Sequence, residues 1–245
     1  MNHKSKKSEF GFTIIELMMA MAFISVLLVV ITMTIIQIGN IYNKGLTMRA
    51  VNQSGTTISA DIRQTLSSSQ PFDVTKAFFL QSQNGGATTN VGDAVAGRLC
   101  TGTYSYIWNF GKSSTSVNAY ENSDKKIGFV RVRDNGAQYC ANLGSKIADS
   151  DQADPREFFA TDDASLAIQS FSITKLATDT ALSQALYNIV FEVGTNDADA
   201  LQREQHIDTI DTTCKPPSDA SALQNYCAVN RFDFTAQAGN RGGAS

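Results

Sequence analysis

The chain has 245 residues and a net charge of −3 at neutral pH, with 20 Lys and Arg against 23 Asp and Glu. This length allows one or two domains of ordinary size. The slightly acidic balance lacks the basic footprint of a nucleic-acid-binding domain, so charge gives no support to a nucleic-acid partner.

The N-terminal segment is basic and is followed by an apolar run. The basic side chains at its start predict that the N-terminus lies on the cytoplasmic side. From Leu17 to Ile36 only Ser25, Thr32 and Thr34 are polar, and a helix of this length spans roughly 30 Å, the thickness of a bilayer core. A secretory signal has a shorter apolar region and ends at a small-residue cleavage site. The run therefore predicts a transmembrane helix that stays on the protein.

One carboxylate, Glu16, stands at the start of this run, where an ionised side chain deep in lipid costs about 2.5–3.5 kcal/mol. Two explanations are open. The stretch Thr13-Ile14-Ile15-Glu16 matches an S/T-x-x-E capping box, in which the two side chains satisfy each other's backbone N–H groups at a helix start. Alternatively, the carboxylate pairs with a free amine of a neighbouring subunit.

The stretch Gly11-Phe12-Thr13-Ile14-Ile15-Glu16-Leu17, followed by an uninterrupted apolar helix, resembles the class III signal of type IV pilins and type II secretion pseudopilins. The resemblance implies that a prepilin peptidase removes residues 1–11 by cutting between Gly11 and Phe12. It also implies that Phe12 becomes N-methylated and that Glu16 is the glutamate needed for assembly.

Two features depart from the common family pattern. Ser8-Glu9-Phe10 separates Lys6-Lys7 from the glycine, whereas family leaders usually carry a basic residue just before it. The apolar run has no proline, whereas many major pilins have one that kinks the helix. The missing proline, together with the late segment Arg231-Phe232-Asp233-Phe234 shortly after a cysteine, resembles the W-type minor pilins and J-type pseudopilins of initiating tip complexes.

Beyond the membrane, apolar residues recur at intervals near 3.6 and predict that the helix continues with one face on a core. These residues are Ile41, Met48, Val51, Ile58, Ile62 and Leu66. Asp61 and Arg63 are among the polar residues between them, and a serine cluster before Pro71 predicts the end of the helix. The expected divisions are a leader (1–11), a membrane and assembly helix (12–38), its amphipathic half (39–69), a β-rich head (70–236) and a disordered tail (237–245).

Residues 72–97 show little regular pattern, and residues 81–90 have the composition of a surface loop. After them, alternation with a period of two predicts half-buried antiparallel strands. The alternating sets are Tyr104, Tyr106, Trp108 and Phe110; Ile127, Phe129 and Arg131; Tyr187, Ile189, Phe191 and Val193; and Phe232 and Phe234, with one more strand at 169–176. The expected fold class is α+β, with a long N-terminal helix on an antiparallel β-sheet head, as in type IV pilins.

Four cysteines lie beyond the membrane helix and predict disulfides in an exported domain. They allow three connectivities. Cys214 and Cys227 enclose a turn-rich loop that resembles the disulfide-bounded loops of many pilins, which favours Cys214–Cys227 together with Cys100–Cys140. Zinc is the alternative, but there is no C-x₂-C pair, and His3 and His206 are the only histidines.

A catalytic or cofactor site is not expected. His206 is the only histidine beyond the membrane helix, and no G-x-S-x-G nucleophile elbow occurs. The acid pairs Asp162-Asp163 and Asp197/Asp199 could do acid–base chemistry, but we interpret them as loop residues.

Two charged segments are candidate binding sites. The first supplies oxygen ligands of the kind that calcium prefers, which some pseudopilins hold in the head; an ordinary acidic surface loop is the favoured interpretation. Its members are Asp149, Asp151, Asp154 and Glu157. The second could meet an anionic partner, including DNA, although the solvated side of an edge strand is favoured. Its members are Lys125, Lys126, Arg131 and Arg133.

The resemblance as a whole implies a minor pilin that helps initiate a type IV pilus or pilus-like fibre and is incorporated in it. The alternatives are a J-type pseudopilin of a type II secretion system and an unprocessed membrane-anchored adhesin or receptor. The implied partners are major and minor pilin subunits through the N-terminal helix, a prepilin peptidase, the inner-membrane assembly platform and the cytoplasmic membrane. The implied location is the inner membrane, with a single pass, and then the extracellular fibre.

Overall fold

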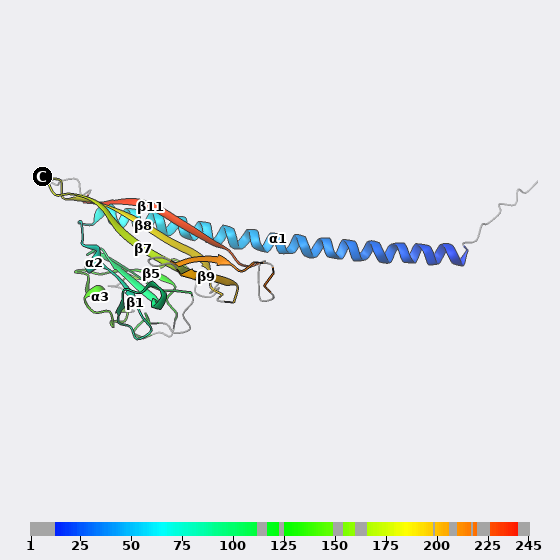
Figure 1. Cartoon of the computed structure of the whole chain (residues 1–245), viewed down its shortest axis with the longest axis horizontal. Coiled ribbons are helices and arrows are strands. Elements are labelled where there is room, and N and C mark those ends of the chain that lie inside the picture. The colour runs from blue at the N-terminus through cyan, green and yellow to red at the C-terminus, as the bar shows by residue number, and fades with distance from the viewer. Residues whose placement is uncertain are drawn as a thin grey trace, which may run out of the picture. The chain divides into compact units, whose positions relative to one another are not determined.

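The computed structural model of the chain describes residues 13–111, 117–122, 125–148, 154–159, 166–197, 199–205, 210–216, 218–219 and 226–239 (Figure 1). Two compact units, Met1–Asn43 and Lys44–Ser245, make up the chain. Each unit is described by itself.

One helix, α1 (Ile14–Ser68), runs from the first unit into the second. Its buried residues begin only at Val51 and continue with Gly55, Ile58, Asp61, Ile62, Thr65 and Leu66. The expected core-facing stripe is therefore confirmed from Val51 to Leu66. It is wrong for Ile41 and Met48, whose side chains are exposed. The helix ends before Pro71, as the serine cluster predicts.

A six-stranded sheet forms one part of the second unit, in the order β2-β1-β3-β4-β5-β6. Its strands are β1 (Phe78–Gln81), β2 (Ala87–Thr88), β3 (Ala96–Cys100), β4 (Tyr104–Asn109), β5 (Phe129–Arg133) and β6 (Arg156–Glu157). The short helix α2 (Val74–Ala77) precedes β1, while η1 (Val91–Asp93) lies between β2 and β3 and α3 (Gln138–Ala141) between β5 and β6. All of its strand pairs are antiparallel.

A three-stranded sheet, in the order β11-β8-β7, lies along the second half of α1 (Figure 1). Its strands are β7 (Leu166–Asp179), β8 (Gln184–Thr195) and β11 (Val229–Ala238), again paired antiparallel. A separate two-stranded hairpin is formed by β9 (Leu201–Gln205) and β10 (Ile210–Cys214). The antiparallel sheets and the long helix confirm the coarse expectation of an α+β chain.

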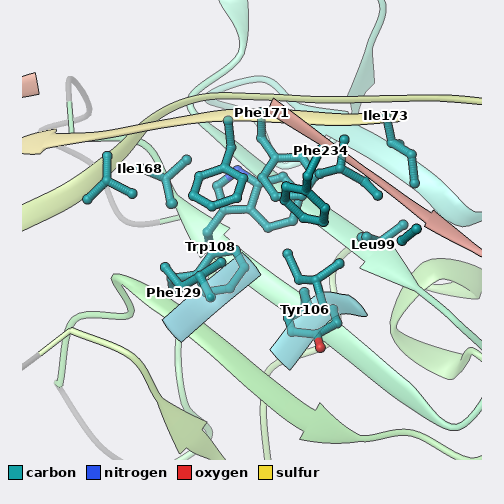
Figure 2. Close-up of a cluster of buried hydrophobic side chains, with 14 of the residues drawn as sticks. Leu99, Tyr106, Trp108, Phe129, Ile168, Phe171, Ile173 and Phe234 are labelled. Carbon is teal, nitrogen blue, oxygen red and sulfur yellow. The ribbon is translucent and has the colours of Figure 1, made fainter. Parts of the chain in front are cut away.

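The main core brings α1 and both larger sheets together in one cluster of buried side chains. Trp108 lies at its centre and stacks on Phe171 with ring centroids 4.6 Å apart, while Phe129 and Phe78 also contact the indole ring. Figure 2 shows Trp108, Phe129 and Tyr106 from the six-stranded sheet facing Ile168, Phe171 and Ile173 from β7. The alternating aromatic residues thus belong to the core or pack against it, as we interpret them from the sequence, except Tyr104, which is half-buried and lies outside the clusters.

The expectation of half-buried strands is wrong for β3 and β4. All of β3 is buried, and β4 is buried on both faces except for Tyr104 at its start. The reason is a second cluster on the opposite face of the six-stranded sheet, made of Ile107, Tyr120, Ile127, Val130, Val132 and Ile147. Loops that precede and follow β5 cover this face.

Two further expectations are corrected. Residues 72–97 contain α2, β1, β2, η1 and the start of β3, so their weak pattern hides regular structure. Ile127 does not share a face with Phe129 and Arg131, because β5 begins at Phe129 and Ile127 belongs to the second cluster. In both places the segments are short, and short segments give little periodicity to detect.

Candidate functional site

The start of α1 forms a capping box. The backbone N–H and the hydroxyl of Thr13 both donate to Glu16 Oε2, each at 2.9 Å, and the N–H of Glu16 lies 3.4 Å from the Thr13 hydroxyl. The Leu17 N–H donates to the Thr13 carbonyl at 3.2 Å, so the helical ladder begins at Thr13. This confirms the local explanation of Glu16, and it leaves the second oxygen, Oε1, without a partner among the described residues.

The first part of α1 exposes apolar side chains all around. The large side chains from Ile14 to Ile38 are exposed in the isolated chain, as is Ile41 beyond them. The three polar residues of the run do not interrupt the helix, because Ser25, Thr32 and Thr34 each donate a hydroxyl hydrogen bond to the carbonyl four residues earlier. Within the described residues, α1 is the one helix long and apolar enough to cross a membrane.

The proposed cleavage site cannot be placed on this geometry, since Gly11 and Phe12 lie outside the described residues. The first described residue, Thr13, is already the N-cap of α1. The helix therefore starts within two residues of the bond that the resemblance marks for cleavage.

The four cysteines form two disulfides in the second unit. Cys100 pairs with Cys140, which ties β3 to α3, and Cys214 pairs with Cys227, which ties the end of β10 to the segment before β11. This is the same pairing that the resemblance to pilin loops favours. No cysteine is left free to act as a nucleophile or a metal ligand.

The calcium candidates are only partly described. Asp149 and Asp151 lie outside the described residues, while Asp154 and Glu157 lie within them. Glu157 accepts a hydrogen bond from the Tyr120 hydroxyl and lies 3.9 Å from the Lys125 ammonium group. Burial raises the pKa of its carboxyl group. Among the described residues, no three His, Cys, Asp or Glu side chains come together as a metal site.

The acid–base candidates are not brought together in the described part of the chain. Asp162, Asp163 and His206 lie outside it. Asp197 accepts the backbone N–H of Asp199 at 2.9 Å, a local turn contact of a loop residue.

The basic group is split by the fold. Arg133 is exposed, but Arg131 is mostly buried, with a side chain 18% exposed, and it donates to Asp61 at 2.8 Å. Strand β5 also pairs on both sides, with β4 and β6, so it is not an edge strand. The interpretation of Arg131 as a solvated edge residue is therefore wrong, because the helix supplies a buried partner for it.

That partner, Asp61, is the centre of a buried polar cluster that the sequence pattern does not reveal. Its side chain is 4% exposed, and its Oδ2 accepts bonds of 2.8 Å from both Arg131 and Arg156. Its Oδ1 accepts a 2.7 Å bond from the Tyr106 hydroxyl, which also lies 2.7 Å from the Thr65 hydroxyl. Burial, and then the negative charge of Asp61, raises the pKa of Tyr106 well above its ordinary value.

The cluster joins α1 to three strands of the six-stranded sheet, β4, β5 and β6. One signal in the sequence could have found it. Asp61 follows Ile58 by three residues and precedes Thr65 by four, and Ile58 and Thr65 both lie on the buried face of the helix. A carboxylate in such a register belongs to the buried stripe and needs a buried cation.

A second buried charge, Arg98 on β3, was not singled out by the sequence either. Its guanidinium group donates to oxygens of Asn118, Tyr139, Asn142 and Ser145 at 2.7–3.2 Å. Burial lowers its pKa to about 10. Arg98 thus fastens the segment that contains Cys140 to the six-stranded sheet.

Comparisons of the chain with family models, with curated proteins and with solved structures find no match.

Proposed function

We propose that this chain is a minor pilin that is processed by a prepilin peptidase and is incorporated in a type IV pilus or pilus-like fibre, where it helps initiate assembly. A J-type pseudopilin of a type II secretion system is the closest alternative, since it would use the same N-terminal chemistry. In both cases the role is structural, the fibre subunits are the partners, and the chain passes from the inner membrane to the cell exterior.

The observation that carries the proposal is the start of α1. A Gly-Phe-Thr-x-x-Glu sequence stands directly before an apolar helix, and Thr13 caps that helix with Glu16. Cleavage after Gly11 would leave a chain whose new N-terminus lies one residue before the cap. The antiparallel sheets and the two disulfides of the second unit are consistent with an exported head.

The mechanism follows from charge in a medium of low dielectric. Cleavage exposes the amine of Phe12, which is a new cation. Glu16 of a neighbouring subunit can pair with it, and such a pair attracts far more strongly in lipid than in water. Because both Thr13 bonds go to Oε2, the oxygen Oε1 can accept the amine while the cap stays formed.

Mass spectrometry of the N-terminus tests the processing step. The full chain is produced in a bacterium with and without a prepilin peptidase, next to a Gly11→Leu variant. We expect the mature chain to begin at a methylated Phe12 only when the peptidase is present, and the variant to stay intact. A wild-type chain that still begins at Met1 beside an active peptidase contradicts the proposal and favours an uncleaved membrane-anchored surface protein.

Two substitutions at Glu16 then separate charge from capping. Glu16→Ala removes both, whereas Glu16→Gln keeps the capping box, since glutamine serves at the same position, and removes only the charge. We expect both variants to be inserted in the membrane and absent from sheared fibres. Normal incorporation of Glu16→Gln would contradict pairing with an amine, and continued absence of Glu16→Ala would then assign the loss to the cap. Gln37→Ala, at the exposed far end of the same run, is the control.

A further inference from the structure

A buried carboxylate lies beneath the β9–β10 hairpin. Glu192, on β8, is only 4% exposed. Its neighbours Phe191 and Val193 point to the main core, so alternation turns Glu192 to the other face of the three-stranded sheet. In the register of the three-stranded sheet, Glu192 lies opposite Ser170 on β7 and Arg231 on β11. The hairpin covers this face, because the backbone N–H of Thr212 on β10 donates to Glu192 Oε2 at 3.2 Å.

Strands β9, β10 and β11 each contribute a charged group near Glu192. Arg203 on β9 is partly buried. Its charge interacts with that of Glu192, but its Nη2 donates to Gln169 Oε1 at 2.6 Å. Arg231 on β11 lies 3.4 Å from Asp211 on β10 rather than at Glu192. Within the part of the chain that the structure describes, Glu192 forms no ion pair within 4.0 Å. Asp211 is a second negative charge near it.

These surroundings favour the neutral carboxyl group. A buried ionised carboxylate is costly unless cations or several donors compensate it. Glu192 accepts one backbone hydrogen bond, from Thr212, and the Ser170 hydroxyl also favours its ionised form. Neither nearby arginine forms an ion pair with it, because Arg203 donates to Gln169 and Arg231 lies at Asp211. Burial, the largest influence, raises its pKa, and the negative charge of Asp211 acts in the same direction.

The disulfide and the apolar contacts that hold the base of the hairpin involve no titratable side chain. The Cys214–Cys227 disulfide joins β10 to the segment before β11. Ala200, Leu201 and Cys227 form a small apolar cluster with Cys214 and Val229. The hairpin is thus tied at its base, and the contact with Glu192 lies next to that base on β10.

We propose that Glu192 makes the docking of the β9–β10 hairpin on the three-stranded sheet depend on pH, with the neutral carboxyl group favouring the docked hairpin and the ionised one favouring its release. The proposal does not depend on the assignment of the chain to a fibre. The β9–β10 hairpin of the second unit would then become more exposed as the pH rises from mildly acidic to neutral.

The direction follows from proton linkage. The docked state holds the proton of Glu192 to a higher pH than the open state, in which the carboxyl group is solvated. The opening equilibrium therefore rises with pH from about 4.5, the ordinary value, and levels off above the raised pKa. Since one proton is involved, the rise is at most about tenfold per pH unit.

Hydrogen exchange followed by mass spectrometry tests this on the full chain in detergent micelles. Exchange of peptides that cover β9 and β10 is measured from pH 4.5 to 8 and divided by the rate of an unstructured peptide at each pH. We expect protection of β10 in the wild type to fall several-fold across this range. Protection of β4, in the main core, should change much less. In Glu192→Gln, β10 protection should be independent of pH and at the high level of the acidic wild type.

Glu204→Gln is the matched control, because Glu204 is an exposed acid on β9 of the same hairpin. It should keep the wild-type pH dependence. The proposal is overturned if β10 protection in the wild type does not change with pH, or if Glu192→Gln retains the change. The wild-type measurements show whether β10 protection depends on pH even if Glu192→Gln does not fold.

Discussion

At the scale of single residues, the strongest constraint in the second unit is the carboxylate of Asp61. It neutralises Arg131, whose guanidinium group also stacks on the Tyr104 ring at 4.7 Å, and it accepts the Tyr106 hydroxyl. Arg156 is different, because its side chain is 52% exposed and water can solvate it. Loss of Asp61 would therefore leave the mostly buried Arg131 without its carboxylate partner, whereas the Tyr106 hydroxyl would keep Thr65.

We expect Asp61→Ala to lower the free energy of unfolding by roughly 3 kcal/mol, since removing one partner of a buried ion pair leaves an uncompensated charge. Denaturation followed by the fluorescence of Trp108, the single tryptophan, measures the effect. Gln64→Ala, an exposed substitution one turn along the helix, should change stability by less than about 0.5 kcal/mol. Equal effects of the two substitutions would contradict a central role for the cluster.

At the scale of elements, the burial of the side chains of α1 changes along its length. Its first part exposes apolar side chains, and its second part buries one face from Val51 onward. The close approach at Gly55 explains one detail of this face. A Cβ atom there would collide with the ring of Phe232 on β11, so the helix and the strand can pack this closely only because the residue is glycine. Asn52 and Asn230 are bonded at 2.7 Å one turn away.

Two glycines of α1 provide opposite expectations for the same substitution. Gly45→Ala meets no atom within 4 Å, so it should stabilise the helix by up to about 1 kcal/mol through helix propensity. Gly55→Ala gains the same propensity but forces the Phe232 ring to move, and overpacking costs about 1–3 kcal/mol. We expect a net loss for Gly55→Ala in thermal unfolding. A melting temperature at or above that of Gly45→Ala would show that the ring moves without strain.

At the scale of the whole molecule, two covalent links and several long-range contacts hold the second unit together. The Cys100–Cys140 disulfide closes a stretch of 40 residues, whereas Cys214–Cys227 closes one of 13. Arg98 reinforces the first link by binding the same segment, 138–145, to β3. The second link serves mainly the β9–β10 hairpin.

The chain-entropy model predicts that the longer closed stretch contributes more to stability, by about 1 kcal/mol for these two separations. We therefore expect the double variant Cys100→Ser and Cys140→Ser to unfold at lower denaturant concentration than the double variant Cys214→Ser and Cys227→Ser. Trp108 fluorescence during guanidinium titration compares them. An equal or reversed order would mean that contacts around the hairpin, rather than loop closure, dominate.

The sequence by itself determined those features that depend on neighbouring residues. The 3.6-residue period predicted α1, the serine cluster before Pro71 predicted its end, and the Thr13-x-x-Glu16 pattern predicted its cap. Alternating aromatic residues located β4, β8 and β11 for the same reason. The resemblance at residues 11–17 supplied the proposed processing site and role, and that part stays a prediction.

Only the tertiary structure decided which polar residues are buried and which strands have two covered faces. Asp61 and Arg156 are 95 residues apart, and Glu192 meets Thr212 across 20. The hairpin β9–β10 and the short strands β1, β2 and β6 also lack enough alternation to be read locally. Burial of a charge depends on what packs against it, and for these residues the packing partners come from distant parts of the chain.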